Sequence, residues 1–191
     1  MSDKIKNHIE DFHAYGIYIP RRTIEIFGEI NEEMSSQVVR NLHALDHTTG
    51  TINVMINSPG GETLHGMAIF DALRGCKNHV RGMVFGEAAS SASFILQSCD
   101  ERCMSPNSYL MLHVGTDPMD MDLHPEAKKS WDKKFQDDEI WMEDVFLKKI
   151  KQKKKRYTRN QLKSLIRFDK ILTPKEALEL GLIDRIEEHF E

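Results

Sequence analysis

A serine and a histidine in this chain have neighbours that suit nucleophilic catalysis. Ser90 follows residues 86–89, which are mostly small, and His113 ends the apolar run 110–112. A serine hydroxyl is a poor nucleophile at neutral pH unless a base removes its proton, and histidine is the usual base. Small neighbours would let a substrate backbone approach the hydroxyl. Serines in small-residue runs also pack helices, so the pair alone leaves both interpretations open.

A second candidate feature is the sequence Ile-Asn-Ser-Pro-Gly-Gly at residues 56–61, which follows a strand-like run at 51–56. A Pro-Gly-Gly turn can hold backbone conformations that other residues avoid and can leave N–H groups unpaired. Unpaired N–H groups aimed at a reacting carbonyl form an oxyanion hole. An ordinary strand-to-helix turn is the alternative that this segment alone favours.

A candidate acid lies near the C-terminus. Asp169 comes just before a strongly indicated helix start at Thr173-Pro174. An aspartate in that position is ordinarily a turn residue. A catalytic triad, however, needs a buried carboxylate that orients the histidine, and Asp169 could supply it.

Four segments together carry a family resemblance: residues 56–61, 86–93, 106–113 and 169–184. In order and spacing they resemble the proteolytic subunit of the Clp protease, a serine peptidase of the ClpP/crotonase superfamily. Residues 22–30 also resemble the first core strand of that family. The resemblance covers about residues 20–115 and 165–187, and it depends on the agreement of all four motifs.

The resemblance implies specific roles for five residues. Ser90 would be the nucleophile, His113 the base and Asp169 the orienting acid. The backbone N–H groups of Gly61 and Ser91 would form the oxyanion hole. No metal ion and no organic cofactor is implied.

The resemblance also implies a fold and an assembly. The expected α/β fold is a ClpP/crotonase-like superhelix of repeated β-β-α units with a projecting handle helix. Family membership implies subunits that form homo-oligomeric rings, which stack into a barrel around the sites. The resemblance further implies an ATP-driven AAA+ unfoldase that delivers unfolded protein and peptide substrates. This chain has no phosphate-binding loop of its own.

The chain departs from the family pattern at two places. Ser91 and Ala92 stand where the family usually has methionine and glycine, so Ser91 and Ser93 are rival nucleophiles in the sequence. The segment 114–124 lacks the usual glycine-rich strand and contains Asp117, Asp120 and Asp122 instead. We therefore expect altered substrate pairing or ring stacking at this segment, while the triad is unaffected.

Composition fits one peptidase domain spanning residues 1–191. A chain of 191 residues can bury about 70% of its unfolded surface. The net charge of −4 argues against nucleic acid as a main partner, and no apolar run is long enough to span a membrane. Because the N-terminus lacks a signal-peptide pattern and the three cysteines form no paired framework or metal motif, we expect a cytoplasmic protein with reduced thiols.

The basic run 148–156 follows acidic residues, as expected for the end of a long helix, although a polyanion site is an alternative.

Hydrophobic periodicity predicts alternating strands and helices and hence a largely parallel sheet. The expected strands are 24–27, 54–56, 80–85 and 108–113, and the expected helices are 31–44, 62–73, 90–98 and 125–151. Residues 1–20 are expected to form an arm or loop, and about 115–155 the handle. An apolar helix side with Trp131, Phe135 and Trp141 predicts a subunit interface.

Two other functions remain open at this stage. One is a catalytically silent structural ring subunit, which would keep the fold and lose the triad. The other is a crotonase-type acyl-CoA enzyme, which shares the superfamily fold but does not need a Ser-His-Asp set. The joint presence of Ser90, His113 and Asp169 favours the peptidase over both.

Overall fold

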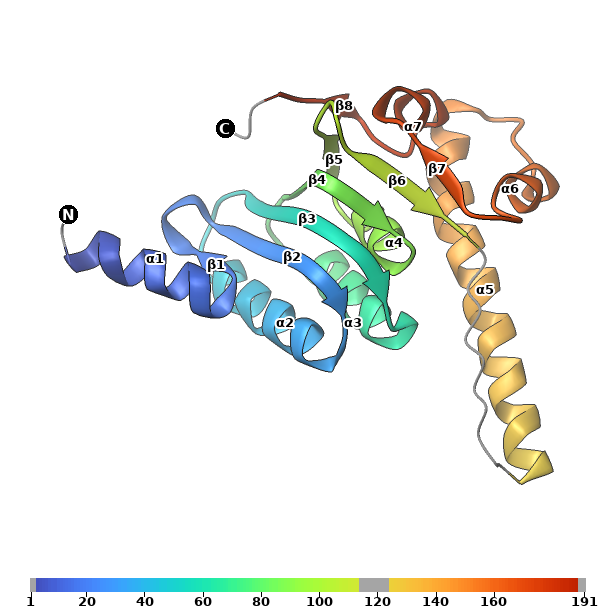
Figure 1. Ribbon diagram of the computed structural model, residues 1–191, viewed down its shortest axis with the longest axis horizontal. Coiled ribbons are helices and arrows are strands. Elements are labelled where there is room, and N and C mark those ends of the chain that lie inside the picture. Colours follow the sequence, from blue (N-terminus) through green and yellow to red (C-terminus); the bar gives the residue numbers. More distant parts are fainter. Residues whose placement is uncertain (1–2, 114–123, 189–191) are drawn as a thin grey trace.

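The computed structural model describes residues 3–113 and 124–188 (Figure 1). The strands are β1 (Ile17–Tyr18), β2 (Thr23–Ile30), β3 (Ile52–Gly61), β4 (Val80–Ala89), β5 (Glu101–Met104), β6 (Tyr109–Leu112), β7 (Lys170–Leu172) and β8 (Arg185–Ile186). The helices are α1 (Asp3–Tyr15), α2 (Glu32–Asp46), α3 (Thr63–Gly75), α4 (Ser91–Leu96), α5 (Pro125–Lys153), α6 (Arg159–Leu165) and α7 (Pro174–Leu180), with a 3-10 turn at Ile19–Arg21. No helix in these two ranges has both the length and the apolar character needed to cross a membrane.

The strands form one sheet in the order β1-β2-β3-β4-β5-β8, with β6 paired to β4 and β7 paired to β6. Neighbours from β2 to β8 along this order are parallel, whereas β1 and β7 are antiparallel to their partners. Helices α2, α3 and α4 cover one face of the sheet (Figure 1). This arrangement confirms the expected mixed α/β fold with a largely parallel sheet.

Strand β4 has two partners, and this division positions the candidate site. Its first half pairs with β5, with Arg81 opposite Glu101, and its second half pairs with β6, with Ala89 opposite Met111. The parallel β4–β6 pairing brings the carboxyl ends of these two strands together. The candidate serine and histidine follow those two ends directly.

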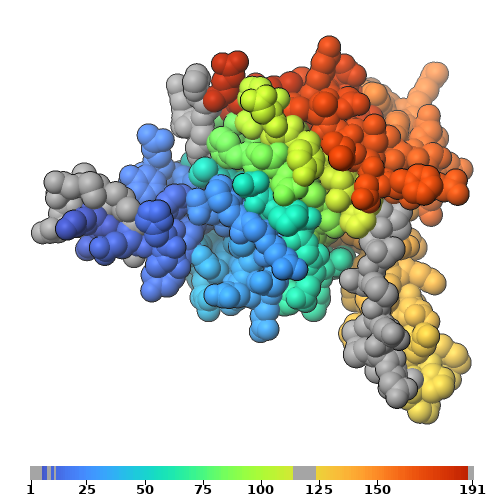
Figure 2. Space-filling view, viewed as in Figure 1, coloured from blue at the N-terminus to red at the C-terminus, as the bar shows by residue number. Residues whose placement is uncertain are grey.

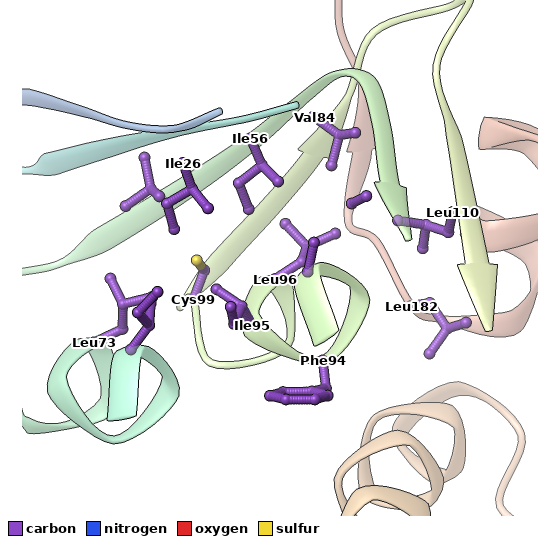
Figure 3. Packing of buried hydrophobic residues seen from close by; sticks show 14 of the residues in the cluster. Ile26, Ile56, Leu73, Val84, Phe94, Ile95, Leu96, Cys99, Leu110 and Leu182 are labelled. Atoms are coloured by element: carbon purple, nitrogen blue, oxygen red, sulfur yellow. The ribbon is translucent and has the colours of Figure 1, made fainter. Parts of the chain in front are cut away.

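Alternation along the central strands explains the core. Ile52, Val54 and Ile56 of β3 are fully buried, while the residues between them are partly exposed. Short helix α4 lies under the sheet, and Figure 3 shows Ile95 and Leu96 on its sheet-facing side. Because every residue of α4 is buried, the helix contacts the sheet on one side and other helices on the other. This packing fixes the position of the turn that precedes α4.

Polar side chains cap the first turns of three helices. Asn31 caps α2 by accepting from the Met34 N–H. Thr158 and Thr173 form capping boxes at α6 and α7, with Gln161 and Glu176 as their partners. These caps satisfy N–H groups that the first helical turn cannot pair internally.

Two sequence predictions of local structure were wrong. The N-terminal residues expected to form an arm or loop contain helix α1, which ends at Tyr15 and precedes β1. The predicted Pro-Gly-Gly turn lies inside strand β3, because Gly60 and Gly61 stay paired with Glu29 and Ile30 of β2 after a register shift. The parallel neighbour therefore continues the strand past a sequence that ordinarily ends one.

Helix α5 divides into a projecting part and a packed part (Figures 1 and 2). Trp131 and Ile140 are exposed on the projecting part, whereas Phe146 is buried in the core. Trp141 contacts the rings of Phe70 and Phe94 edge to face. The apolar side that was predicted to form one interface is therefore divided. Trp131 is exposed, whereas Trp141 packs within its own subunit. The divergent residues 114–123 lie outside the described ranges.

A buried ion pair holds the C-terminal segment against the sheet. The Arg102 guanidinium is almost fully buried and donates to Asp184 through Nε (3.0 Å) and Nη2 (2.6 Å). Its Nη1 donates to Gln97 Oε1 (3.0 Å). Burial acts to raise the pKa of Asp184, but hydrogen bonds from Arg102 and its charge outweigh burial and lower that pKa. The pair therefore stabilises the fold above the ordinary aspartate pKa, and its contribution is lost as pH falls through the lowered value.

We predict that Asp184→Asn lowers the free energy of unfolding by about 1–3 kcal/mol near neutral pH, a range reduced from that of fully buried pairs because Asp184 is partly exposed. Urea denaturation at matched protein concentration measures the effect. The difference from the native protein should shrink as the pH falls below the ordinary aspartate pKa and through the lowered pKa of Asp184, because the native carboxylate then becomes protonated. Asp132→Asn, at an exposed position of α5, is the control. An equal loss for both variants would contradict the structural role of the pair.

Candidate active site

Ser90 lies at a sharp turn between β4 and α4. Its backbone dihedrals are φ 51° and ψ −122°, and Arg22 is the one other non-glycine residue with positive φ among those described. The Ser90 N–H donates to the Met111 carbonyl on β6 at 2.9 Å. A strained strand-to-helix turn is also how other hydrolases expose a nucleophilic serine, so this conformation supports a functional role.

His113 directly follows β6 and contacts the serine. Its Nε2 lies 2.7 Å from Ser90 Oγ, a hydrogen-bond distance at which the histidine can accept the hydroxyl proton. Both side chains are partly exposed, which leaves them open to a substrate. The structure therefore brings together the first two of the predicted site residues.

Asp169 lies beside the histidine but does not hydrogen-bond to it. The residue precedes β7, whose antiparallel pairing with β6 sets Lys170 opposite Leu112. Its Oδ1 is 3.9 Å from His113 Nδ1, and its side chain is 73% exposed. The expectation of a buried carboxylate was wrong, because Asp169 lies in the open loop between α6 and β7 next to the exposed Phe168.

The two rival serines are occupied by other contacts. Ser91 Oγ donates to the Gly61 carbonyl at 3.2 Å, and Ser93 Oγ donates to the Ser90 carbonyl at 2.5 Å. Both residues are buried. Of the three neighbouring hydroxyls, only that of Ser90 contacts a histidine.

The two glycines of β3 approach the site differently. A Cβ at Gly60 would lie 2.7 Å from Ser90 Cβ and 3.0 Å from the Ser91 nitrogen. A Cβ at Gly61 would lie 2.2 Å from the Ile30 carbonyl oxygen on β2. A side chain at Gly61 would therefore displace the neighbouring strand β2. Gly60, which the sequence did not single out, makes the closer approach to the serine.

A narrow pocket lies between His113 and helix α5. Glu139, Met142, Glu143 and Phe146 of α5 line it, together with Ile166 after α6. Glu143 is ion-paired with Arg159 (2.7 Å) and Lys163 (3.4 Å). These residues were not predicted as neighbours of the site, although the spacing of Met142 and Phe146 marks them as one helix face.

The other reactive groups form no competing centre in the described ranges. Glu101, Cys103 and Glu187 have potential ligand atoms within 4.8 Å of one another. Arg81 forms an ion pair with Glu187, and Arg185 forms one with Glu101, so cations of the chain itself already neutralise these carboxylates. Burial raises the pKa of Cys99 to about 12, which keeps that thiol protonated and unreactive.

Comparison with known proteins first defines the class of fold. The structure is similar to a solved structure of a mutant of ClpP1 from Listeria monocytogenes, with a TM-score of 0.77 and 24% sequence identity. The match covers 90% of this chain and 94% of that chain. At this identity the likeness establishes the fold, which is the mixed α/β fold of ClpP.

The family follows from the sequence match. The Clp protease family matches this chain over residues 6–190, and the chain therefore belongs to that family. It is a ClpP-like peptidase subunit by fold and by family.

We predict that an alkyl fluorophosphonate modifies Ser90 and leaves Ser91 and Ser93 unmodified, because the latter two are buried and already donate to carbonyls. Peptide mapping by mass spectrometry locates the adduct. His113→Ala should slow labelling strongly, because it removes the acceptor of the Ser90 proton. An adduct on Ser91 or Ser93 would refute the assignment.

Proposed function

We propose that this chain is a serine endopeptidase subunit that hydrolyses peptide bonds through an acyl-enzyme. The observation that carries the proposal is the 2.7 Å contact between Ser90 Oγ and His113 Nε2 at the ends of two paired parallel strands. Membership of the Clp protease family supports the same chemistry. Unfolded protein segments and peptides are the proposed substrates.

In the proposed mechanism Ser90 Oγ attacks the scissile carbonyl carbon while His113 Nε2 accepts the hydroxyl proton. The C–N bond of the tetrahedral intermediate then breaks, and His113 transfers the proton to the leaving amine. Water, activated by His113, hydrolyses the resulting ester and regenerates Ser90. In each step His113 Nε2 accepts or donates one proton, and this requires the histidine to lie within hydrogen-bond distance of Ser90 Oγ.

The backbone N–H groups of Gly61 and Ser91 are the proposed oxyanion donors. Ser91 is the first residue of α4, so its N–H has no partner within the helix. The hydrogen bond from Ser91 Oγ to the Gly61 carbonyl joins the two segments and fixes their separation. Donors held in place before the reaction stabilise the developing oxyanion without reorganisation.

Asp169 is the proposed orienting acid. Its oxygen must approach His113 Nδ1 by about 1 Å to form a hydrogen bond, since N–H···O bonds are about 2.9 Å long. The open loop before β7 and the exposed position of the carboxylate allow a side-chain rotation of this size. In that arrangement the carboxylate would hold the tautomer in which Nε2 is free to accept the proton.

We also propose a homo-oligomeric ring assembly in the cytoplasm, served by a AAA+ unfoldase. The projecting part of α5 supports self-association, because Trp131 and Phe135 stack there at 6.0 Å and Ile140 is exposed. An apolar aromatic surface on a helix that leaves the body of the molecule is poorly suited to water. Enclosure would also keep the site away from folded host proteins.

We predict that Ser90→Ala lowers kcat for peptide hydrolysis by roughly 10³-fold or more. The substitution removes the nucleophile, so that only transition-state binding remains to accelerate the reaction. Asp169→Asn should cause a smaller loss, roughly 10–100-fold, because the carboxylate is solvated and only orients the histidine. Fluorogenic peptide hydrolysis measures both variants, with Ser130→Ala as a remote serine control. Full activity of a folded Ser90→Ala variant would rule out the mechanism.

We predict that the native protein sediments and scatters light as a closed oligomer at micromolar concentration, and that Trp131→Glu reduces its mass. A charge placed in the aromatic patch would oppose burial of that patch. Ser130→Glu is the matched control, because it adds the same charge one residue away at an exposed position. A monomeric native protein with full peptidase activity would contradict the enclosed assembly.

A further inference from the structure

A second hollow lies away from the Ser90–His113 pair, between α3, α4 and the packed part of α5. Its volume is about 440 Å³, within the range typical of small-molecule sites. Residues of α3 and α5 form its walls, together with Gln97, which directly follows α4. In the ribbon view α4 lies between α3 and α5 (Figure 1). Neither Ser90 nor His113 lines it.

The floor of this cavity is apolar and aromatic. Phe70 of α3 and Trp141 of α5 meet edge to face with ring centroids 4.9 Å apart, and Val145 follows one turn along α5. Phe94 of α4 supports Trp141 from below at 5.4 Å. Rings locked by such contacts form a preformed surface for an apolar group.

The rim of the cavity is basic. Arg74, Lys148 and Lys149 line it, and none of the three has an ion pair with a carboxylate of the described residues. The acidic residue of the lining is Asp144, which is already ion-paired with Arg159. The cavity therefore presents an excess of positive charge above an apolar floor.

Lys149 is the cation placed deepest in this arrangement. Its Nζ donates to the Cys99 carbonyl oxygen at 3.4 Å. Burial, together with the charge of Arg102, lowers the pKa of Lys149 to about 8. The remaining charged or titratable groups that act on it are Asp184, Cys99 and Arg74. A partly desolvated ammonium that forms no direct ion pair can donate charge-assisted hydrogen bonds to an anionic ligand.

We propose that this cavity binds a small amphipathic carboxylate, with its apolar body on Phe70, Trp141 and Val145 and its carboxylate at Lys149. An uncharged hydrocarbon would leave the cations of the rim unpaired, and a cationic ligand would be repelled by them. The carboxylate would form the direct ion pair that Lys149 makes with no carboxylate of the described residues, and Lys148 and Arg74 add to the attraction at the rim. The proposal is independent of the peptidase chemistry.

Decanoate is the test ligand, and Trp141 is the reporter. The chain has two tryptophans, so a Trp131→Phe background leaves Trp141 as the single one. We expect a saturable change in Trp141 fluorescence with decanoate, and weaker binding of decanol and decyltrimethylammonium. Affinity for decanoate should fall as pH rises through about 8, because Lys149 then loses its charge.

Lys149→Gln in the same background should weaken decanoate binding at least about tenfold, the change expected on loss of one charge-assisted contact, and should leave decanol binding unchanged. Lys151→Gln is the matched control, because Lys151 is exposed on the same helix and does not line the cavity. Equal binding of decanoate and decanol would overturn the proposal, as would no response of Trp141 or equal affinities of the two lysine variants.

Light scattering in parallel shows whether decanoate changes the oligomer mass. Such a change would assign the cavity to a subunit contact and overturn the proposal.

Discussion

The pairing of the second half of β4 with β6 is the constraint on which the candidate site depends. Ala89 lies opposite Met111, and the Ser90 N–H continues the ladder to the Met111 carbonyl. This last bond holds Ser90 in its positive-φ conformation, which no helix or strand would otherwise favour. Because His113 lies two residues after Met111, directly beyond the end of β6, the same pairing sets the distance between the hydroxyl and the imidazole.

Packing beneath the turn prevents its relaxation. Helix α4 follows immediately and is buried on every side, with its leucine and isoleucine against the sheet and Phe94 against Phe70 (Figure 3). Gly60 approaches the serine from β3 so closely that a methyl group there would displace it. Contacts from the sheet on one side and the helices on the other therefore hold Ser90 in its strained conformation. On the histidine side, β7 pairs with β6 and brings Asp169 near, but the loop before β7 leaves that carboxylate in water.

Much of this arrangement could be predicted from the sequence, and the failures have physical causes. Periodicity marked helices α2, α3, α4 and α5, and Thr173-Pro174 marked the start of α7, because those signals are local. Ser90 and His113 could be paired through the family motifs, and the structure places them in contact. The extension of β3 through Gly60 and Gly61 could not be predicted, since it depends on pairing with β2, a contact distant in sequence. The exposure of Asp169 and the separation of Trp141 from the projecting aromatics likewise depend on tertiary packing, which a helical pattern does not report.

Trapping of the covalent intermediate tests the central claim most directly. An activated ester of a short peptide, mixed with the protein and quenched in acid before one turnover is complete, should yield subunits that carry one acyl group. Fragmentation should locate that group on Ser90. The acylated form should then decay at the rate of steady-state turnover if deacylation is the slow step for esters. Hydrolysis that proceeds without an acylated subunit, or with the acyl group on another residue, would contradict nucleophilic catalysis by Ser90.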